Sequence, residues 1–339
     1  MITTVKGLIQ PKDLGIVALQ EYILLGLPGW GDNPFLDFNR PKVFDAVLTR
    51  LKDFKGAGGQ TLVDAGGMLL GRDALMLRDI AASAGIHIVA STGLGSERDM
   101  PGHFVHTFSA EKAKPGRNRQ TGLETSSSDW AFPADVLCDE LTKGMVVPGM
   151  IRTSVKAGIV TAASSWDKVT PIEEMSLRGA AMAAKRAGVV LYIADGARHA
   201  RQLLDMALDA GLEPGRIVIG HCDDGRAIDP ARDKEIAEKG AYVAFDHVGW
   251  EDPSVPSALS DDQRIERVKA MVKAGLAEQV VLSCSAIGYA IDGPQPKHSF
   301  AYLLKEFVPR LKKAGVKDSV IDTILIENPK RILATKASQ

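Results

Sequence analysis

Short apolar runs alternate with longer amphipathic stretches along almost the whole chain. Eight runs recur in this way: 15–25, 61–65, 86–92, 157–162, 189–193, 216–219, 241–247 and 279–285. Such runs are typical of buried parallel strands, and the stretches between them are typical of helices. The alternation predicts an α/β fold, a single (β/α)8 TIM barrel over residues 1–339. A doubly wound open sheet is the alternative, but no GxGxxG or Walker motif follows an early run.

Composition excludes several classes of protein. Lys plus Arg total 41 and Asp plus Glu total 42, so no basic excess indicates a nucleic-acid partner. No run approaches the ~18 apolar residues of a membrane span, and the first residues lack the pattern of a signal peptide. Cys138, Cys222 and Cys284 form no CxxC pair. We therefore expect a cytoplasmic, reduced protein of enzyme size.

One connection is unusually long. Residues 94–131, after the third run, are rich in Gly, Ser, Arg and Pro. Loops of this length are usually functional, so an active-site lid is expected here. Trp166 and Trp250 also follow strand ends, where they would either line a pocket for a bulky or aromatic substrate or only pack down their loops.

Several motifs, in order, resemble the phosphotriesterase-like family of the amidohydrolase superfamily. They are Thr4-Val5-Lys6-Gly7-Leu8-Ile9 with Leu14-Gly15, Gly71-Arg72-Asp73, Val89-Ala90-Ser91-Thr92-Gly93, Ala157-Gly158-Ile159, Ile219-Gly220-His221-Cys222-Asp223-Asp224, Phe245-Asp246-His247 and Asn328-Pro329-Lys330-Arg331. The resemblance covers essentially the whole chain. It implies a distorted (β/α)8 barrel, usually dimeric, that hydrolyses phosphotriesters, lactones or related esters.

The resemblance also implies a site with two divalent ions. The family's ligands are a His-x-His pair on the first strand, a carbamylated lysine on the fourth, histidines on the fifth and sixth, and an aspartate on the eighth. Two metals lower the pKa of a shared water and polarise the scissile group. In this chain the corresponding positions carry Gln20, Tyr22, Thr161, Ala194, His221 and Ser285. Five of the six ligands are lost, so we expect a divergent member without a metal cofactor.

Most of the replacements can form hydrogen bonds, which favours a retained site over a repaired scaffold. Gln20 and Tyr22 share one face of their strand and should point into the barrel. We expect the following residues to contact substrate: Gln20, Thr161, Asp195, Trp166, Trp250 and Arg198. Arg198 or Arg226 is a candidate to receive a carboxylate, although most arginines near loops are only solvated.

Asp224, His247 and Ser285 form the sharpest catalytic hypothesis. In the family, the positions of Asp224 and His247 form a proton relay to the metal-bound aspartate, which is Ser285 here. A carboxylate, a histidine and a serine can perform nucleophilic acyl transfer. His247 could instead activate water directly, with Ser285 only binding substrate. The structural alternative is that His247 and Asp224 hold two loops together.

The leading hypothesis is therefore a metal-independent hydrolase of a small ester or lactone, with an aromatic substrate as one option. A lyase or isomerase is the runner-up, because His247 and His221 could act as acid and base with Tyr22 as an oxyanion partner. A ligand-binding barrel without catalysis is the third reading. The expected partners are a small molecule and, by family analogy, a second copy of the chain in a homodimer.

Overall fold

The structure is a computed structural model that describes residues 1–102, 104–106, 131–147, 151–194, 196–252 and 258–335. Its centre is a curled sheet of nine parallel strands in the order β12-β11-β10-β9-β8-β5-β4-β3-β13. The strands are β3 (Val17–Leu25), β4 (Thr61–Asp64), β5 (His87–Leu94), β8 (Ile159–Ala163), β9 (Leu191–Ala194), β10 (Ile217–Ile219), β11 (Tyr242–Phe245), β12 (Val280–Leu282) and β13 (Ile287–Ala290). Two short antiparallel hairpins, β1 (Ile2–Thr4) with β2 (Gly7–Ile9) and β6 (Val146–Val147) with β7 (Ile151–Arg152), lie outside this sheet.

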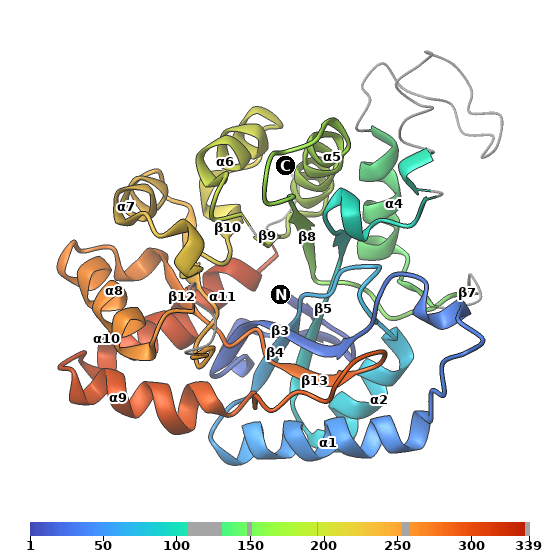
Figure 1. Ribbon diagram of the computed structural model, residues 1–339, viewed down its shortest axis with the longest axis horizontal. Coiled ribbons are helices and arrows are strands. Elements are labelled where there is room, and N and C mark those ends of the chain that lie inside the picture. The colour runs from blue at the N-terminus through green and yellow to red at the C-terminus, as the bar shows by residue number, and fades with distance from the viewer. Residues whose placement is uncertain (103, 107–130, 148–150, 195, 253–257, 336–339) are drawn as a thin grey trace.

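Helices surround the strands as an outer ring (Figure 1). They are α1 (Arg40–Gly56), α2 (Ala74–Ala84), α4 (Ala131–Thr142), α5 (Pro171–Ala187), α6 (Ala200–Asp209), α7 (Pro230–Glu238), α8 (Asp261–Lys273), α9 (Val308–Lys313), α10 (Asp318–Asp322) and α11 (Asn328–Leu333). The sequence specifies these helices locally, as α5 shows. Thr170 and Glu173 form a capping box at its start, and Gly188 ends it in the left-handed conformation.

The last strand position of the barrel is divided into β12 and β13. Between them, Ser285 N–H donates to Gln20 O at 3.0 Å, and Tyr22 N–H donates to Ala286 O at 2.9 Å. The connecting residues thus bond to β3, and the barrel closes there. This break gives the end of β12 an irregular backbone that a continuous strand would not have.

The end of the barrel at which the strands begin is filled with apolar side chains. Ile2 of β1 and Ile332 and Leu333 of α11 join the cluster inside the strands, which includes Leu19, Val63 and Val218. A larger cluster lies between the strands and the helices. Because one end is plugged, the opposite end, where parallel strands finish, is the place for a site.

The predicted fold class is confirmed, and each of the eight apolar runs contains a strand. The ninth strand, β13, was not predicted, because Ile287-Gly288-Tyr289-Ala290 is short and contains a glycine. Most of the predicted lid at 94–131 lies outside the described residues, so its role stays a prediction; Leu94 itself ends β5 and Ala131 begins α4. No described helix has the length and apolar character needed to cross a membrane.

Candidate active site

His221 follows β10 at the open end of the barrel, and its backbone has a φ of 55°. Side-chain-bearing residues rarely adopt this conformation, and among the described residues only His221 and Ser285 do so. The N–H of His221 donates to both carboxylate oxygens of Asp246, at 3.0 and 3.2 Å. Ring Nδ1 of His221 also lies 3.2 Å from Asp246 Oδ1. Asp246, which follows the neighbouring strand β11, therefore positions both the backbone and the ring of His221.

Tyr192 of β9 donates its hydroxyl to the second oxygen of Asp246, and both side chains are buried. The ring of Tyr192 reaches this place because Gly220 has no side chain; a Cβ there would lie 2.9 Å from the tyrosine oxygen. Burial raises the pKa of Tyr192 well above its usual value, and the charge of Asp246 raises it further. Tyr192 is thus a neutral hydrogen-bond donor that holds the carboxylate.

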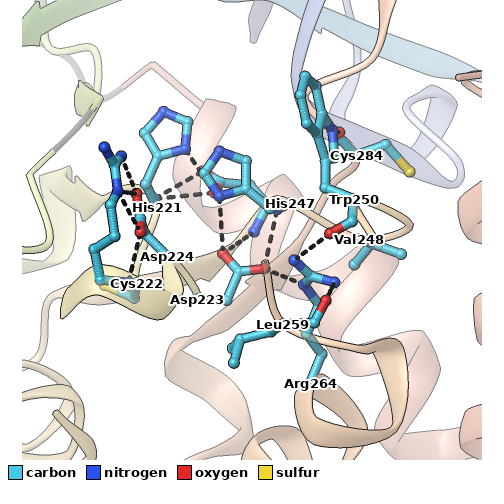
Figure 2. A network of polar contacts seen from close by, with 12 residues as sticks. His221, Cys222, Asp223, Asp224, His247, Val248, Trp250, Leu259, Arg264 and Cys284 are labelled. Carbon is cyan, nitrogen blue, oxygen red and sulfur yellow. Dashed lines mark hydrogen bonds and ion pairs between the residues drawn. The ribbon is translucent and has the colours of Figure 1, made fainter. Parts of the chain in front are cut away.

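His247 stacks on His221, with ring centroids 4.3 Å apart and planes inclined by 20°. Its backbone N–H donates to Asp223 Oδ2 at 3.1 Å, and its Nδ1 lies 3.8 Å from Asp223 Oδ1. Figure 2 shows Asp223 between His247 and Arg264. Arg264 is buried and donates to Asp223 from Nε at 2.8 Å. Asp223 thus links the loop that carries His247 to helix α8.

The two stacked histidines have different electrostatic surroundings. Burial lowers the pKa of His247, and the charge of His221 lowers it further, so His247 is a neutral imidazole at neutral pH. Burial acts to raise the pKa of Asp246, but the charge and hydrogen bonds of His221 outweigh burial and lower it. Asp246 is therefore an ionised carboxylate facing His221, where it stabilises a protonated ring. A neutral base beside a counter-charged imidazole is the arrangement of an acid–base pair.

Gln20, Tyr22 and Ser285 lie at the junction of β3 and the broken last strand. Gln20 Nε2 donates to the Tyr22 hydroxyl at 3.0 Å, so these side chains share a face as predicted. Gln20 Oε1 and Ser285 Oγ are buried and have no hydrogen-bond partner among the described residues. Buried polar atoms normally find partners, so these two atoms are places where a bound ligand would complete the bonding.

Glu21 sets the backbone around Ser285 from the opposite face of β3. It accepts hydrogen bonds from Ser283 Oγ at 2.8 Å, Cys284 N at 3.0 Å and Ala286 N at 2.6 Å. Burial raises the pKa of Glu21 to about 8 despite these donors. The three bonds fix the residues on both sides of Ser285, whose φ is 45°. Ser285 is thus held in a strained conformation at the mouth of the barrel.

The other predicted substrate-contacting residues lie around this centre. Thr161 Oγ1 donates to Thr92 O at 3.2 Å. The guanidinium groups of Arg198 and Arg226 lie over the Trp166 ring, 4.9 and 4.1 Å from its centroid. Trp250 is 45% exposed and lies 5.9 Å from His247 between ring centroids. Asp195 falls outside the described residues, so its role stays a prediction.

The predicted chain of Ser285, His247 and Asp224 is not assembled. Asp224 forms an ion pair with Arg226 at 2.5 Å. Burial acts to raise the pKa of Asp224, but the hydrogen bonds of Arg226 lower it. Asp223 is the carboxylate that contacts His247, and Ser285 Oγ has no hydrogen-bond partner among the described residues. The turn after His221 directs these two adjacent aspartates to different partners, which their spacing did not reveal.

Sequence reasoning also missed Asp246, Tyr192 and Arg264. A signal for Asp246 was present in the alternation of Tyr242, Ala244 and Asp246, which places all three on the inner face of one strand. No comparable signal marked Arg264, because a charged residue on an amphipathic helix ordinarily faces solvent. Its burial is apparent only once α8 packs beneath Asp223.

The residues present do not fit the binuclear metal centre that the resemblance implied. One described group, His221, Asp246 and His247, has potential ligand atoms within 4.8 Å of one another. However, the oxygens of Asp246 already accept from the Tyr192 hydroxyl and the His221 N–H. Gln20 and Ser285 supply only weak ligand atoms on the opposite side. The described residues offer no second ligand set, and an ion bound to Asp246 would compete with the hydroxyl of Tyr192.

Comparison with known proteins identifies relatives over nearly the full length. A phosphotriesterase homology protein of Mycobacterium tuberculosis is 28% identical over 98% of this chain and 97% of its own length. An aryldialkylphosphatase of Saccharolobus solfataricus is 27% identical (97% and 98%), and an N-acetyltaurine hydrolase of Dictyostelium discoideum is 25% identical (98% and 97%). All names that state an activity here are names of hydrolases.

The solved structures agree on the fold. A mutant of the phosphotriesterase-like lactonase of Deinococcus radiodurans superposes with a TM-score of 0.84 at 23% identity, over 98% of this chain and 100% of that one. The model of the phosphotriesterase family matches residues 1–333. The chain therefore belongs to the phosphotriesterase family.

Proposed function

We propose that this protein is a metal-independent hydrolase of a small ester or lactone. The observation that carries the proposal is the stacked pair of His221 and His247, in which Asp246 lies 3.2 Å from the ring of His221 while burial keeps His247 neutral. Family membership supports hydrolysis in general, and the departures at five metal-ligand positions support a mechanism that uses side chains alone.

His247 is the proposed general base. Its lowered pKa keeps the imidazole neutral near pH 7, so it can accept a proton from a water molecule. The water oxygen then bonds to the acyl carbon, and the carbonyl oxygen gains a negative charge. His221, protonated against Asp246, donates a hydrogen bond to that oxygen.

Collapse of the intermediate breaks the bond to the leaving-group oxygen, which takes the proton of His221. The proton on His247 returns to His221 through solvent, which restores both rings. Ser285 and Gln20 bind the substrate in this scheme through their unpartnered oxygens. The absence of a hydrogen bond to Ser285 Oγ among the described residues favours attack by water over a covalent serine intermediate.

The leaving group of the natural substrate can be an alcohol or an amine, and the N-acetyltaurine hydrolase relatives support including amides in a test. The test is turnover of a panel of small esters, lactones and N-acetyl amides by protein treated with a chelator. We expect hydrolysis that is lost in His247→Gln. Turnover that requires added metal, or elimination products without any hydrolysis, would contradict the proposal.

A further inference from the structure

A groove of about 370 Å³ opens between the loop after β9 and the loop after β10. Four arginines line it, Arg198, Arg201, Arg226 and Arg232, and Asp229 is the one acidic residue among the described lining residues. The groove adjoins the proposed catalytic pair. Arg226 is bonded to Asp224, whose N–H donates to the carbonyl of His221 at 2.9 Å.

Three of these arginines already have acidic partners. Arg201 pairs with Asp229 at 2.9 Å and with Glu235 at 2.6 Å. Arg232 is buried against Asp233, and Arg226 pairs with Asp224.

Arg198 differs from the other three. It is exposed, and no carboxylate of the described residues lies within ion-pair distance of it. The groove therefore carries a positive charge that a ligand can neutralise.

Trp166 holds the guanidinium group of Arg198 in position. The guanidinium groups of Arg198 and Arg226 both lie over its ring, and its carbonyl oxygen lies 3.1 Å from His199 Nε2. Stacking on an aromatic ring orients the planar guanidinium and leaves its N–H groups free to bind at the edge. An oriented guanidinium fork matches the two oxygens of a carboxylate.

The start of α6 also favours negative charge in the groove. The residue that precedes the helix, His199, makes no side-chain cap, and the first turn holds no acidic residue. Residues 197–202 line the groove, so the unpaired N–H groups of this turn lie beside it.

We propose that the groove binds the carboxylate of a substrate whose ester or lactone group lies at His221 and His247. Arg198 is the primary contact and Trp166 holds it in place. This inference rests on the proposed function in one respect: only if the protein is a hydrolase is the bound carboxylate part of a substrate. Binding of a carboxylate to the groove is a separate claim that needs no turnover.

The binding claim is tested with propionate and its neutral isostere propionamide, at constant ionic strength, by the change in tryptophan fluorescence and by calorimetry. Propionate should bind saturably and propionamide should not. Arg198→Gln should weaken propionate binding about tenfold, since a hydrogen-bonded charge pair is lost. Arg201→Gln is the matched control, because Arg201 lines the same groove but is already paired. In Trp166→Phe the fluorescence response should disappear while calorimetry still detects binding.

The proposal is overturned if neither compound binds, if both bind equally, or if Arg198→Gln binds propionate as the wild type does. A separate turnover measurement tests the hydrolase activity. The turnover test compares monomethyl succinate with methyl succinamate, which differ only in their free carboxylate. Arg198→Gln should raise the KM of the charged ester about tenfold and leave its kcat and the neutral ester unchanged. Propionate binding without any ester turnover would leave the groove in place and contradict the hydrolase.

Discussion

The carboxylate of Asp246 contacts His221 at two points, its backbone N–H and its ring Nδ1. The same carboxylate accepts the hydroxyl of Tyr192. One buried charge therefore maintains the left-handed backbone of His221 and supplies the counter-charge of its ring. Asp246 is a positioning residue: it acts on the substrate only through His221.

Asp246→Asn removes this counter-charge while keeping the side-chain shape. We expect kcat to fall by roughly 10²-fold or more, because His221 would no longer be held as a proton donor. The alkaline limb of the kcat/KM profile should also move to lower pH, a change that simple loss of packing does not produce. Tyr192→Phe is the milder companion, with a loss of about tenfold, since one hydrogen bond to the carboxylate is removed. An unchanged alkaline limb in Asp246→Asn would rule out the pairing as the source of the acid.

His247 should set the acid limb of the same profile. Burial, and then the charge of His221, lower its pKa below 6.5, so the acid limb should be centred below that value. His247→Gln should lower kcat by roughly 10²- to 10⁴-fold. His87→Gln is the matched control, because His87 is a partly buried histidine at the start of β5, at the opposite end of the barrel. An acid limb centred above 6.5 would assign the base to another group.

The strands were predictable because parallel strands buried on both faces are continuous apolar runs. That Gln20 and Tyr22 share one face of their strand also followed from strand alternation. The carboxylate that each histidine contacts could not be predicted in this way. His221 meets Asp246 only because its backbone adopts a φ of 55° and because Gly220 leaves room for Tyr192. Both conditions depend on three neighbouring strands, so no local pattern could distinguish Asp223, Asp224 and Asp246.

Substitution of Ser285 distinguishes a role in substrate binding from a role as the nucleophile. Since its hydroxyl has no hydrogen-bond partner among the described residues, Ser285→Ala should lower kcat/KM by about tenfold, mainly through KM. Loss beyond about 10³-fold, or a phosphonate adduct on Ser285, would establish a covalent mechanism instead. Ser285→Gly provides a second measurement. It should be more stable than Ser285→Ala by ~1 kcal/mol in chemical unfolding, because glycine adopts the positive φ without strain.

Metal analysis tests the loss of the family's ligands. Purified protein should contain well under one equivalent of transition metal, and a chelator should leave turnover unchanged. The reason is that Asp246, the carboxylate in the one described cluster of potential ligands, is already bonded to Tyr192 and His221. A stoichiometric pair of ions, or activity restored only by added metal, would show that the substituted positions still form a centre.

Glu21 predicts how the free energy of unfolding changes with pH. Burial raises its pKa from the usual 4.5 to about 8, so the folded state binds its proton more tightly than the unfolded state. Stability from this group is complete below pH 4.5 and is lost as pH rises toward about 8. The pKa difference sets an upper limit of ~5 kcal/mol, since one pKa unit is ~1.4 kcal/mol.

The measurement is denaturant unfolding between about pH 7.5 and pH 8.5, above the pKa of ~6.5 at which histidines titrate in the unfolded chain. The wild type should lose stability across this range. Glu21→Gln should start less stable, because an amide cannot accept all three hydrogen bonds from residues 283–286, but its stability should be flat with pH. A wild-type stability as flat with pH as that of Glu21→Gln would mean that Glu21 is already ionised in the folded protein and that its three donors outweigh its burial.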